Sequence, residues 1–319
     1  MVDAERILKL AARLCTNEDD RKCVSLIQLI FDVELYRPNI VEQSAKVASF
    51  EQGKTRNRFR KSSALVWRAE VLRRAGRLTL SEINEAEDWA KKLKDRKMHE
   101  AALVLRARHA CETQGPAESL HAFDAAMTMY RERGETNHRL EAECLRARQL
   151  AGQNVEHEEA LRLDNATDRS ALALAELWEV LGDIETSARW AMRAHNRAVA
   201  DGEPYVRRYE LEHTQALLIR LGKPVPEVPT CNLSDNSSHP WEAGAERFAD
   251  SVEARLADEE ALRQAVWDRD LPAVRALVKK GASLFASGED GENALDIARK
   301  LKEKGDPLAD DLSAALRAP

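Results

Sequence analysis

The chain has 319 residues, of which 33% are charged and 44% are hydrophobic, and its formal net charge at pH 7 is -6. This length provides for two or more folding units, and so small a net charge does not imply a general affinity for nucleic acid, although it allows local basic patches. Aromatic residues make up only 5% of the chain, and Ala, Leu, Arg and Glu are abundant. This balance is typical of exposed helices joined by ion pairs, and it predicts an all-α protein.

The sequence offers no sign of secretion, membrane insertion or metal binding. The N-terminal segment contains acidic residues, and no stretch of 18 apolar residues occurs anywhere in the chain. We therefore expect neither a signal peptide nor a membrane span, and we expect a cytoplasmic protein. The five cysteines are odd in number and show no Cys-x-x-Cys spacing, which argues against a disulfide framework and a zinc site. We expect no metal and no cofactor.

Residues 1–61 are predicted to be N-terminal helices that cap a helical array. Apolar residues at three- and four-residue spacing predict helices over residues 3–15, 19–35 and 39–50, with Pro38 between the last two. An end unit must cover the exposed core of its neighbour, which is the role we expect for these helices.

A short basic run follows, with Phe59 among its charges. Its basic residues are Lys54, Arg56, Arg58, Arg60 and Lys61. One interpretation is a phosphate-binding patch, in which the basic side chains neutralise a nucleic-acid backbone and Phe59 stacks on a base. The alternative is a solvated loop or the start of a helix, whose charges pair with nearby acids.

Helical hairpins are predicted over residues 62–222. Glycines follow the apolar-periodic helices at intervals of about 30 to 40 residues. Ser81 is a candidate helix cap, and Pro116 suits the first position of a helix. In the best-defined hairpin, over residues 172–204, Gly182 can end the first helix in the left-handed conformation and Asp183 can cap the second.

That hairpin carries the features of a known repeat. Leu174-Ala175, Trp178, Gly182-Asp183, Ser187 and Ala194 stand where the motif has apolar-small, aromatic, Gly-Asp, small and Ala residues. The segment resembles a tetratricopeptide repeat, whose period is about 34 residues. It departs from the motif at Ala191, where a large aromatic residue is usual, and the other copies are weaker and irregularly spaced. A generic helical bundle is the alternative fold.

The tetratricopeptide resemblance implies an α-solenoid with a concave groove, lined by the first helix of each pair. With each glycine as an anchor, the groove positions are Glu70, Arg73, Arg74, His109, Arg139, Arg146, Gln149, Arg169, Glu176, Tyr209 and Glu212. Several of these residues are basic, so the implied ligand is a partner protein or peptide that is acidic or presents a carboxylate. Ordinary solvent-facing charge is the alternative explanation.

The chain changes character after residue 222. Residues 223–241 hold four of the ten prolines, with Ser and Asn, and are predicted to form a linker or an extended strap over the helices. Residues 242–319 are predicted to contain a helix, from Glu242 to about Asp258, followed by a second repeat-like region.

Residues 261–301 resemble an ankyrin repeat unit. Leu262, Ala265 and Val266 fit its first helix, Leu271, Val274, Leu277 and Val278 its second helix, and Gly281-Ala282 its turn. The next repeat opens at Asp290-Gly291, with Asn293 in place of the usual Thr and Ala294 in place of the usual Pro. The resemblance implies a finger for partner contact at Ser287, Gly288, Glu289, Asp290, Gly291 and Glu292. Because such units are stable only when stacked, we expect this one to dock on the preceding helices or on a partner.

The sequence lacks the familiar motifs of catalysis. It contains no Gly-rich phosphate loop, no His-Glu-x-x-His, no Gly-x-Ser-x-Gly and no kinase signature. We therefore predict a non-enzymatic adaptor or regulatory subunit, a scaffold that binds another protein or peptide through its helical-repeat surface. The alternatives are a nucleic-acid-binding accessory protein that uses Lys54 to Lys61, and a non-catalytic subunit of a larger enzyme or defence complex. The partner and the oligomeric state are left open.

Overall fold

The computed structural model describes residues 2–53, 59–163, 167–231, 240–286 and 292–317. In this part of the chain it contains sixteen α-helices, one short 3-10 helix and no β-strand, so the predicted all-α class is confirmed. The chain divides into two compact units. The first unit comprises residues 1–5 and 22–233, and the second comprises residues 6–21 and 234–319.

The helices before the proline-rich segment are short, and most are separated by two to six residues. Their bounds are α1 (Val2–Arg13), α2 (Glu18–Leu35), α3 (Ile40–Ser49), α4 (Lys61–Arg74), α5 (Leu80–Lys92), α6 (Arg96–Thr113), α7 (Pro116–Arg131), α8 (His138–Leu150), α9 (His157–Leu161), the 3-10 helix η1 (Asp168–Ser170), α10 (Ala171–Val180), α11 (Ile184–Ala198) and α12 (Arg208–Arg220).

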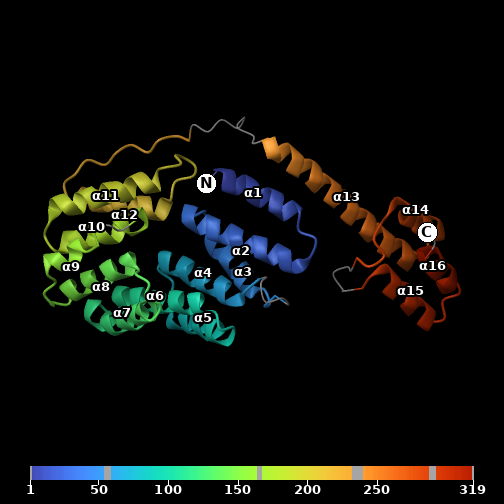
Figure 1. The fold of residues 1–319 in the computed structure, drawn as a ribbon, viewed down its shortest axis with the longest axis horizontal. Coiled ribbons are helices and arrows are strands. Elements are labelled where there is room, and N and C mark those ends of the chain that lie inside the picture. The colour runs from blue at the N-terminus through green and yellow to red at the C-terminus, as the bar shows by residue number, and fades with distance from the viewer. Residues whose placement is uncertain (1, 54–58, 164–166, 232–239, 287–291, 318–319) are drawn as a thin grey trace. The chain divides into compact units, whose positions relative to one another are not determined.

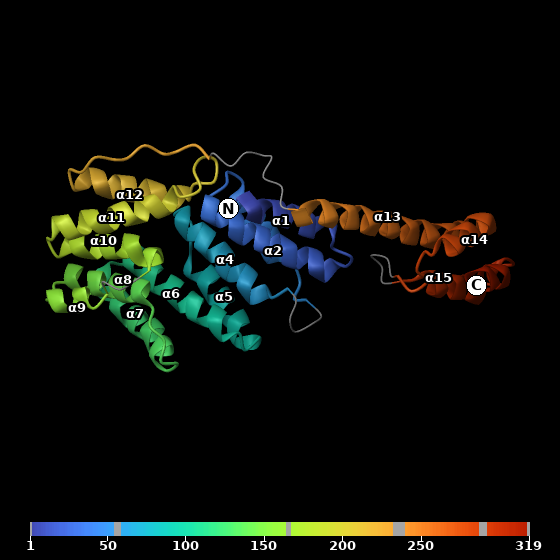
Figure 2. The same ribbon diagram turned by 45° about the horizontal axis from the view of Figure 1, so that its top comes forward.

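Helices in the first unit pack on their neighbours in the chain. From α3 to α8 each helix contacts the next one, and the series continues from α8 to α10, α11 and α12. Helices two apart also touch, with α4 against α6 and α10 against α12. Figures 1 and 2 show the resulting succession of helical pairs.

Local sequence signals set the ends of the helices. The Asp183 carboxylate accepts a hydrogen bond of 2.9 Å from the backbone N–H of Thr186, and Gly182 has a left-handed φ of 85°, so both predicted roles are confirmed. Pro116 is the first residue of α7, also as predicted. The prediction of Ser81 as a cap is wrong. Thr79 caps α5, because Glu82 lies three residues after it and completes a reciprocal capping box.

The hairpin of α10 and α11 supplies the centre of the largest apolar core. Trp178 and Trp190 are both buried there and pack into this core. Ala191 and Ala194 have no exposed surface, and these small side chains let the two helices approach closely. The Ser187 hydroxyl, from α11, donates a hydrogen bond of 2.8 Å to the carbonyl oxygen of Ala175 in α10.

The described part of the proline-rich segment is extended and lies along the first unit. Backbone hydrogen bonds join Glu203 to Pro229 and Cys231, and an isolated bridge pairs Glu203 with Thr230. Val225 packs against the core of α10 and α11, while Val228 packs against the cluster that contains Val206. The strap-like course follows from these contacts, because the closely spaced prolines of this segment prevent a helix.

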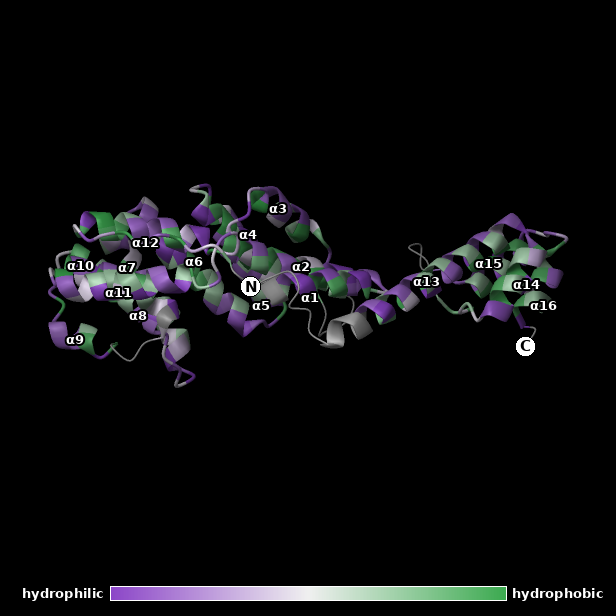
Figure 3. Ribbon diagram, turned by 90° about the horizontal axis from the view of Figure 1, so that it is seen from above, coloured by the Kyte–Doolittle hydropathy of each residue, from purple (hydrophilic) through white to green (hydrophobic). Residues whose placement is uncertain are grey.

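The second unit contains α13 (Pro240–Asp268), α14 (Leu271–Lys280), α15 (Ala294–Glu303) and α16 (Ala309–Arg317). The helix expected to end near Asp258 instead continues through Leu262 and Val266 as one helix of 29 residues. Ala, Glu and Leu, which form helices readily, make up most of the expected break, and neither Gly nor Pro interrupts it. Figure 3 shows hydrophobic and hydrophilic residues alternating along these helices, whose apolar faces form one core.

The turn before α15 is formed as its sequence indicates. Asn293 caps this helix by accepting a hydrogen bond of 3.0 Å from the backbone N–H of Asp296. Of the predicted finger, Ser287 to Gly291 lie outside the described residues, and Glu292 forms an ion pair with Lys300.

All five cysteines are free thiols. Across the described ranges, no helix has both the length and the apolar character needed to cross a bilayer.

Candidate functional site

A charged pocket of about 300 Å³ lies in the first unit. Alternate helices supply most of its walls: α4, α6, α8, α10 and α12 each contribute two or three residues, and α2, α7, η1, α11 and the loop before α12 add one each. Its lining residues are Glu34, Arg73, Arg74, Arg108, Cys111, Glu112, Phe123, Arg139, Glu143, Arg146, Arg169, Leu172, Ala173, Glu176, Arg197, Arg207, Tyr209, Glu210 and His213.

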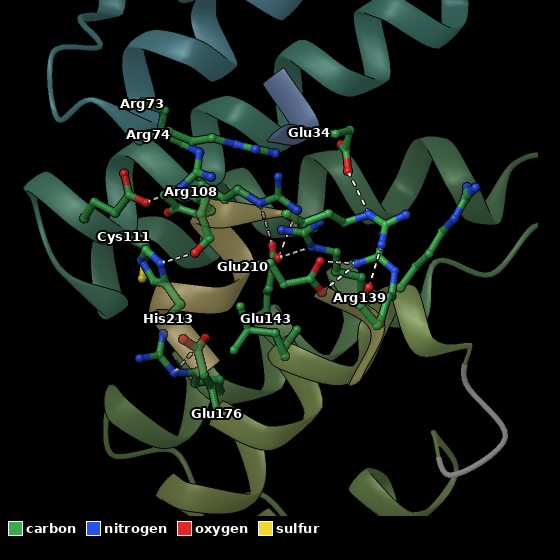
Figure 4. A pocket seen from close by; sticks show the side chains of 18 of the residues that line it. Glu34, Arg73, Arg74, Arg108, Cys111, Arg139, Glu143, Glu176, Glu210 and His213 are labelled. Carbon is green, nitrogen blue, oxygen red and sulfur yellow. Dashed lines mark hydrogen bonds and ion pairs between the residues drawn. The ribbon is translucent and has the colours of Figure 1, made fainter. Parts of the chain in front are cut away.

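Helical periodicity explains why these side chains converge. On one helix, residues three, four or seven positions apart lie on the same face. The lining sets follow this rule, with Arg108, Cys111 and Glu112 on α6, Arg139, Glu143 and Arg146 on α8, and Tyr209, Glu210 and His213 on α12. Each helix thus presents one charged face to the same space (Figure 4).

Glu70 forms the base of one wall, beneath Arg73 and Arg74. It is buried, and its carboxylate accepts hydrogen bonds from Arg73 (2.9 and 3.0 Å) and from Arg74 (2.7 Å). Burial alone would raise the pKa of Glu70, but the two guanidinium groups outweigh it and hold the pKa well below its ordinary value. Arg73 also reaches Glu112 on α6, at 2.6 Å, and so links the two helices.

Glu143 on α8 is shared by two arginines. Arg108 donates to it twice, at 2.8 and 2.9 Å, and Arg139 donates once, at 3.0 Å. Burial opposes ionisation, yet the two arginines together lower the pKa of Glu143. One carboxylate therefore neutralises only one of two positive charges at this point of the pocket.

The ion pair between α8 and α10, formed by Arg146 and Glu176, is more widely spaced than the ion pairs of Glu143. Arg146 Nε lies 3.9 Å from Glu176 Oε2, which is too far for a hydrogen bond, and this buried Nε has no other partner. Burial raises the pKa of Glu176, and Arg146 only partly offsets the effect. Arg169, in η1, is exposed and has no ion-pair partner among the described side chains.

An aromatic and charged wall closes the other side of the pocket. The Arg74 guanidinium lies 4.9 Å from the centre of the Tyr209 ring, a cation–π distance. Arg197 forms a close ion pair with Glu210, and Arg207 lies 3.7 Å from Glu34. These arginines are occupied by contacts within the protein.

Seven of the eleven predicted groove residues line this pocket: Arg73, Arg74, Arg139, Arg146, Arg169, Glu176 and Tyr209. Glu70 lies directly behind them. His109, Gln149 and Glu212 are not lining residues. The Gln149 side chain instead accepts a hydrogen bond of 3.1 Å from the backbone N–H of Val155, and Glu212 is exposed.

Sequence reasoning missed the acidic partners and several arginines. Cys111, Glu112, Arg108, Glu143, Glu210 and His213 lie on the predicted helices, and helical spacing from the predicted positions could have found most of them. No sequence signal marks Glu34, Arg197 or Arg207, because they come from other segments that tertiary packing brings to the pocket.

The predicted basic patch is only partly within the described residues. Arg60 pairs with Asp95 at 3.0 Å, and the Lys61 amine donates a hydrogen bond of 3.1 Å to the carbonyl oxygen of Phe50. Phe59 is only 1% exposed and packs edge-on against Phe50, so the idea that it stacks on a base is wrong. Its ring enters the apolar core, where burial stabilises it. Lys54, Arg56 and Arg58 lie outside the described residues.

A second cavity, of about 450 Å³, lies among α7, α8 and α9. Three arginines line it with three acidic residues, so its charges balance. The first pocket differs, because it has eight arginines against five lining glutamates. This excess makes the first pocket the candidate site. Among the residues that the structure places, no group of three or more His, Cys, Asp or Glu could hold a metal ion.

Comparison with known proteins reveals no relative. No family model, no curated protein and no solved structure matches this chain. Function is therefore inferred from the pocket itself.

Proposed function

We propose that this chain is a non-enzymatic adaptor or regulatory subunit that binds an acidic segment of a partner protein in the charged pocket. In this proposal the first unit is a tetratricopeptide-like α-solenoid, and α4, α6, α8, α10 and α12 are the first helices of its pairs. The proline-rich segment is its strap, and the second unit is an ankyrin-like helical region. The site of action is the cytoplasm.

One observation carries this proposal. Eight arginines from α4, α6, α8, η1, α11 and the loop before α12 face a single pocket, and the five lining glutamates cannot neutralise them all. Arginine presents several donors in a planar fork, which suits carboxylates and other oxyanions in partly desolvated sites. Helical-repeat grooves bind extended segments of other proteins, although the analogy concerns fold and not the identity of the partner.

The dimensions of the pocket favour a short segment. A volume of about 300 Å³ is at the lower end of the range for ligand sites and accommodates only a few side chains. The surrounding helix faces would then add contacts that are individually weak. We therefore expect the pocket to supply orientation and charge selection, and the wider surface to supply additional area.

The test is capture of partners by the full chain from its native lysate, with and without nuclease, followed by mass spectrometry. The double variant R139Q/R169Q serves as the pocket probe, and R220Q, outside the pocket, is its matched control. We expect a nuclease-resistant protein that the control retains and the double variant loses. Loss of every captured protein after nuclease treatment would favour nucleic acid and the run from Lys54 to Lys61. Equal capture by both variants would exclude the pocket as the binding site.

A further inference from the structure

The charges of the pocket do not cancel, and the excess can be located. With Glu70 included, eight arginines meet six carboxylates, which leaves two positive charges. Arg108 and Arg139 share the single carboxylate of Glu143, so one charge remains there. Arg169 has no acidic partner among the described side chains, so it carries the other.

These two charges lie on neighbouring elements. Arg139 is in the first turn of α8, Arg169 is in η1, and η1 packs against α8. Both residues are exposed, whereas Arg73 and Arg108 are held in ion pairs across helices. Arg146, two helical turns after Arg139 on the same face of α8, adds a guanidinium whose buried Nε has no hydrogen-bond partner. The unused donors of the pocket therefore gather along α8 and η1.

We propose that Arg139 and Arg169 bind a dianionic phosphate group carried by a residue of the partner segment. This assignment rests on the proposed function, and it names the feature of the partner that the pocket selects. A phosphorylated side chain carries about -1.5 to -2 charges at pH 7 and three acceptor oxygens. One such group neutralises both excess charges, whereas a single carboxylate neutralises only one.

Glu176 limits the strength of this site. It is the acid nearest to the buried Nε of Arg146, at 3.9 Å, and it faces the same pocket. An incoming phosphate meets its negative charge, and Arg146 is partly engaged by it. The substitution E176Q removes this charge and leaves the shape of the side chain nearly unchanged, so it should tighten phosphate binding. A residue with only a structural role would not produce such a gain.

The test uses the full chain and three capped amino-acid probes, measured by isothermal titration calorimetry at constant ionic strength. The probes are N-acetyl-phosphoserine amide, N-acetyl-aspartate amide and N-acetyl-serine amide. We expect phosphoserine to bind at least about tenfold more tightly than aspartate, and serine not to bind. R139Q and R169Q should each weaken phosphoserine binding about tenfold, E176Q should strengthen it, and R220Q should leave it unchanged.

The outcomes separate this inference from the proposed function. Equal binding of the aspartate and phosphoserine probes, or unchanged binding in R139Q and R169Q, would overturn the phosphate assignment. Inorganic phosphate should bind more weakly than phosphoserine, and equal or tighter binding would assign the site to free phosphate instead. Partner capture that still depends on Arg139 and Arg169 would preserve the proposed function in each of these cases. Partner capture that is unchanged when Arg139 and Arg169 are replaced would contradict the proposed function.

Discussion

Arg108 on α6 and Glu143 on α8 form a two-bond ion pair, with N to O distances of 2.8 and 2.9 Å, that joins two helices which are not consecutive in the chain. Their side chains are only 17% and 15% exposed. The pair therefore fixes the spacing of two walls of the charged pocket. The same ion pair contributes to the unfolding free energy of the first unit.

Replacing Arg108 should destabilise the first unit. R108M leaves the largely buried Glu143 with Arg139 alone, and we expect a loss of about 2 to 3 kcal/mol in unfolding free energy. R220M is the matched control, because Arg220 makes the same two bonds with Glu179, both at 2.9 Å, but is 53% exposed. It should cost less than about 1 kcal/mol. Urea unfolding followed by tryptophan fluorescence measures both, and equal losses would contradict this role for Arg108.

Glu143 and Glu176 should respond to pH in opposite ways. The pKa of Glu143 is lowered from its ordinary value of 4.5. The ionised carboxylate therefore stabilises the fold at pH values above 4.5, and this contribution disappears as the pH falls below 4.5. The pKa of Glu176 is raised, so its ionisation opposes folding at neutral pH.

E143Q should therefore lower the unfolding free energy by about 2 kcal/mol at pH 7. E176Q should raise it at the same pH. The effect of E143Q should shrink as the pH falls below 4.5, whereas the effect of E176Q should shrink as the pH falls towards 4.5 from above, because the folded-state pKa is lowered at Glu143 and raised at Glu176. Urea titrations at pH 7 and pH 4 provide the four values, and effects of the same sign at pH 7 would refute this assignment.

Gly202 should be required for the proline-rich segment to lie where it does. A Cβ atom at this position would stand 2.6 Å from the backbone nitrogen of Cys231, and φ is +71°. Gly182 is the control, because its φ is also positive but a Cβ atom added there would have no atom within 4 Å. G182A should cost about 1 to 2 kcal/mol from backbone conformation alone. G202A should lower the unfolding free energy by more than G182A does, and it should speed hydrogen exchange in residues 223–231. Identical exchange of these residues in the two variants would contradict the prediction.

The Cys144 thiol should react slowly with alkylating reagents in the native protein. Burial, with a contribution from Asp124, raises the pKa of Cys144 to about 11. At pH 8 only about one thiol in a thousand would be ionised, and only the thiolate reacts. Alkylation by iodoacetamide, followed by peptide mass spectrometry, should proceed about a hundredfold more slowly at Cys144 than in the urea-unfolded chain. Equal rates in the two states would show that the site is open.

The fold could be predicted well where short-range chemistry decides it. Pro116, Gly182 and Asp183 set helix ends through backbone geometry and a single side-chain hydrogen bond, which the sequence displays directly. Prediction failed where two signals competed. Thr79 prevailed over Ser81 because only Thr79 has a glutamate three residues later.

The candidate site was predictable in part, for a related reason. Arg73 and Arg139 could be predicted by counting back along their helices from the glycines that follow these helices, Gly76 and Gly152. Arg197 and Arg207 could not, because the packing of α11 and of the loop before α12 carries them to the pocket. Phe59 shows the same limit, since its basic neighbours indicated a surface although the ring is buried.

Photo-crosslinking from inside the pocket tests the central claim most directly. In one variant, the photoreactive residue p-benzoyl-phenylalanine replaces His213, which lines the pocket and is exposed. In a second variant, the same residue replaces Ile219. Ile219 is on the same helix and exposed, but it is not a lining residue. We predict a protein adduct, in nuclease-treated native lysate, at position 213 and none at 219. An adduct at 219 alone, or equal adducts at both positions, would contradict binding in the pocket.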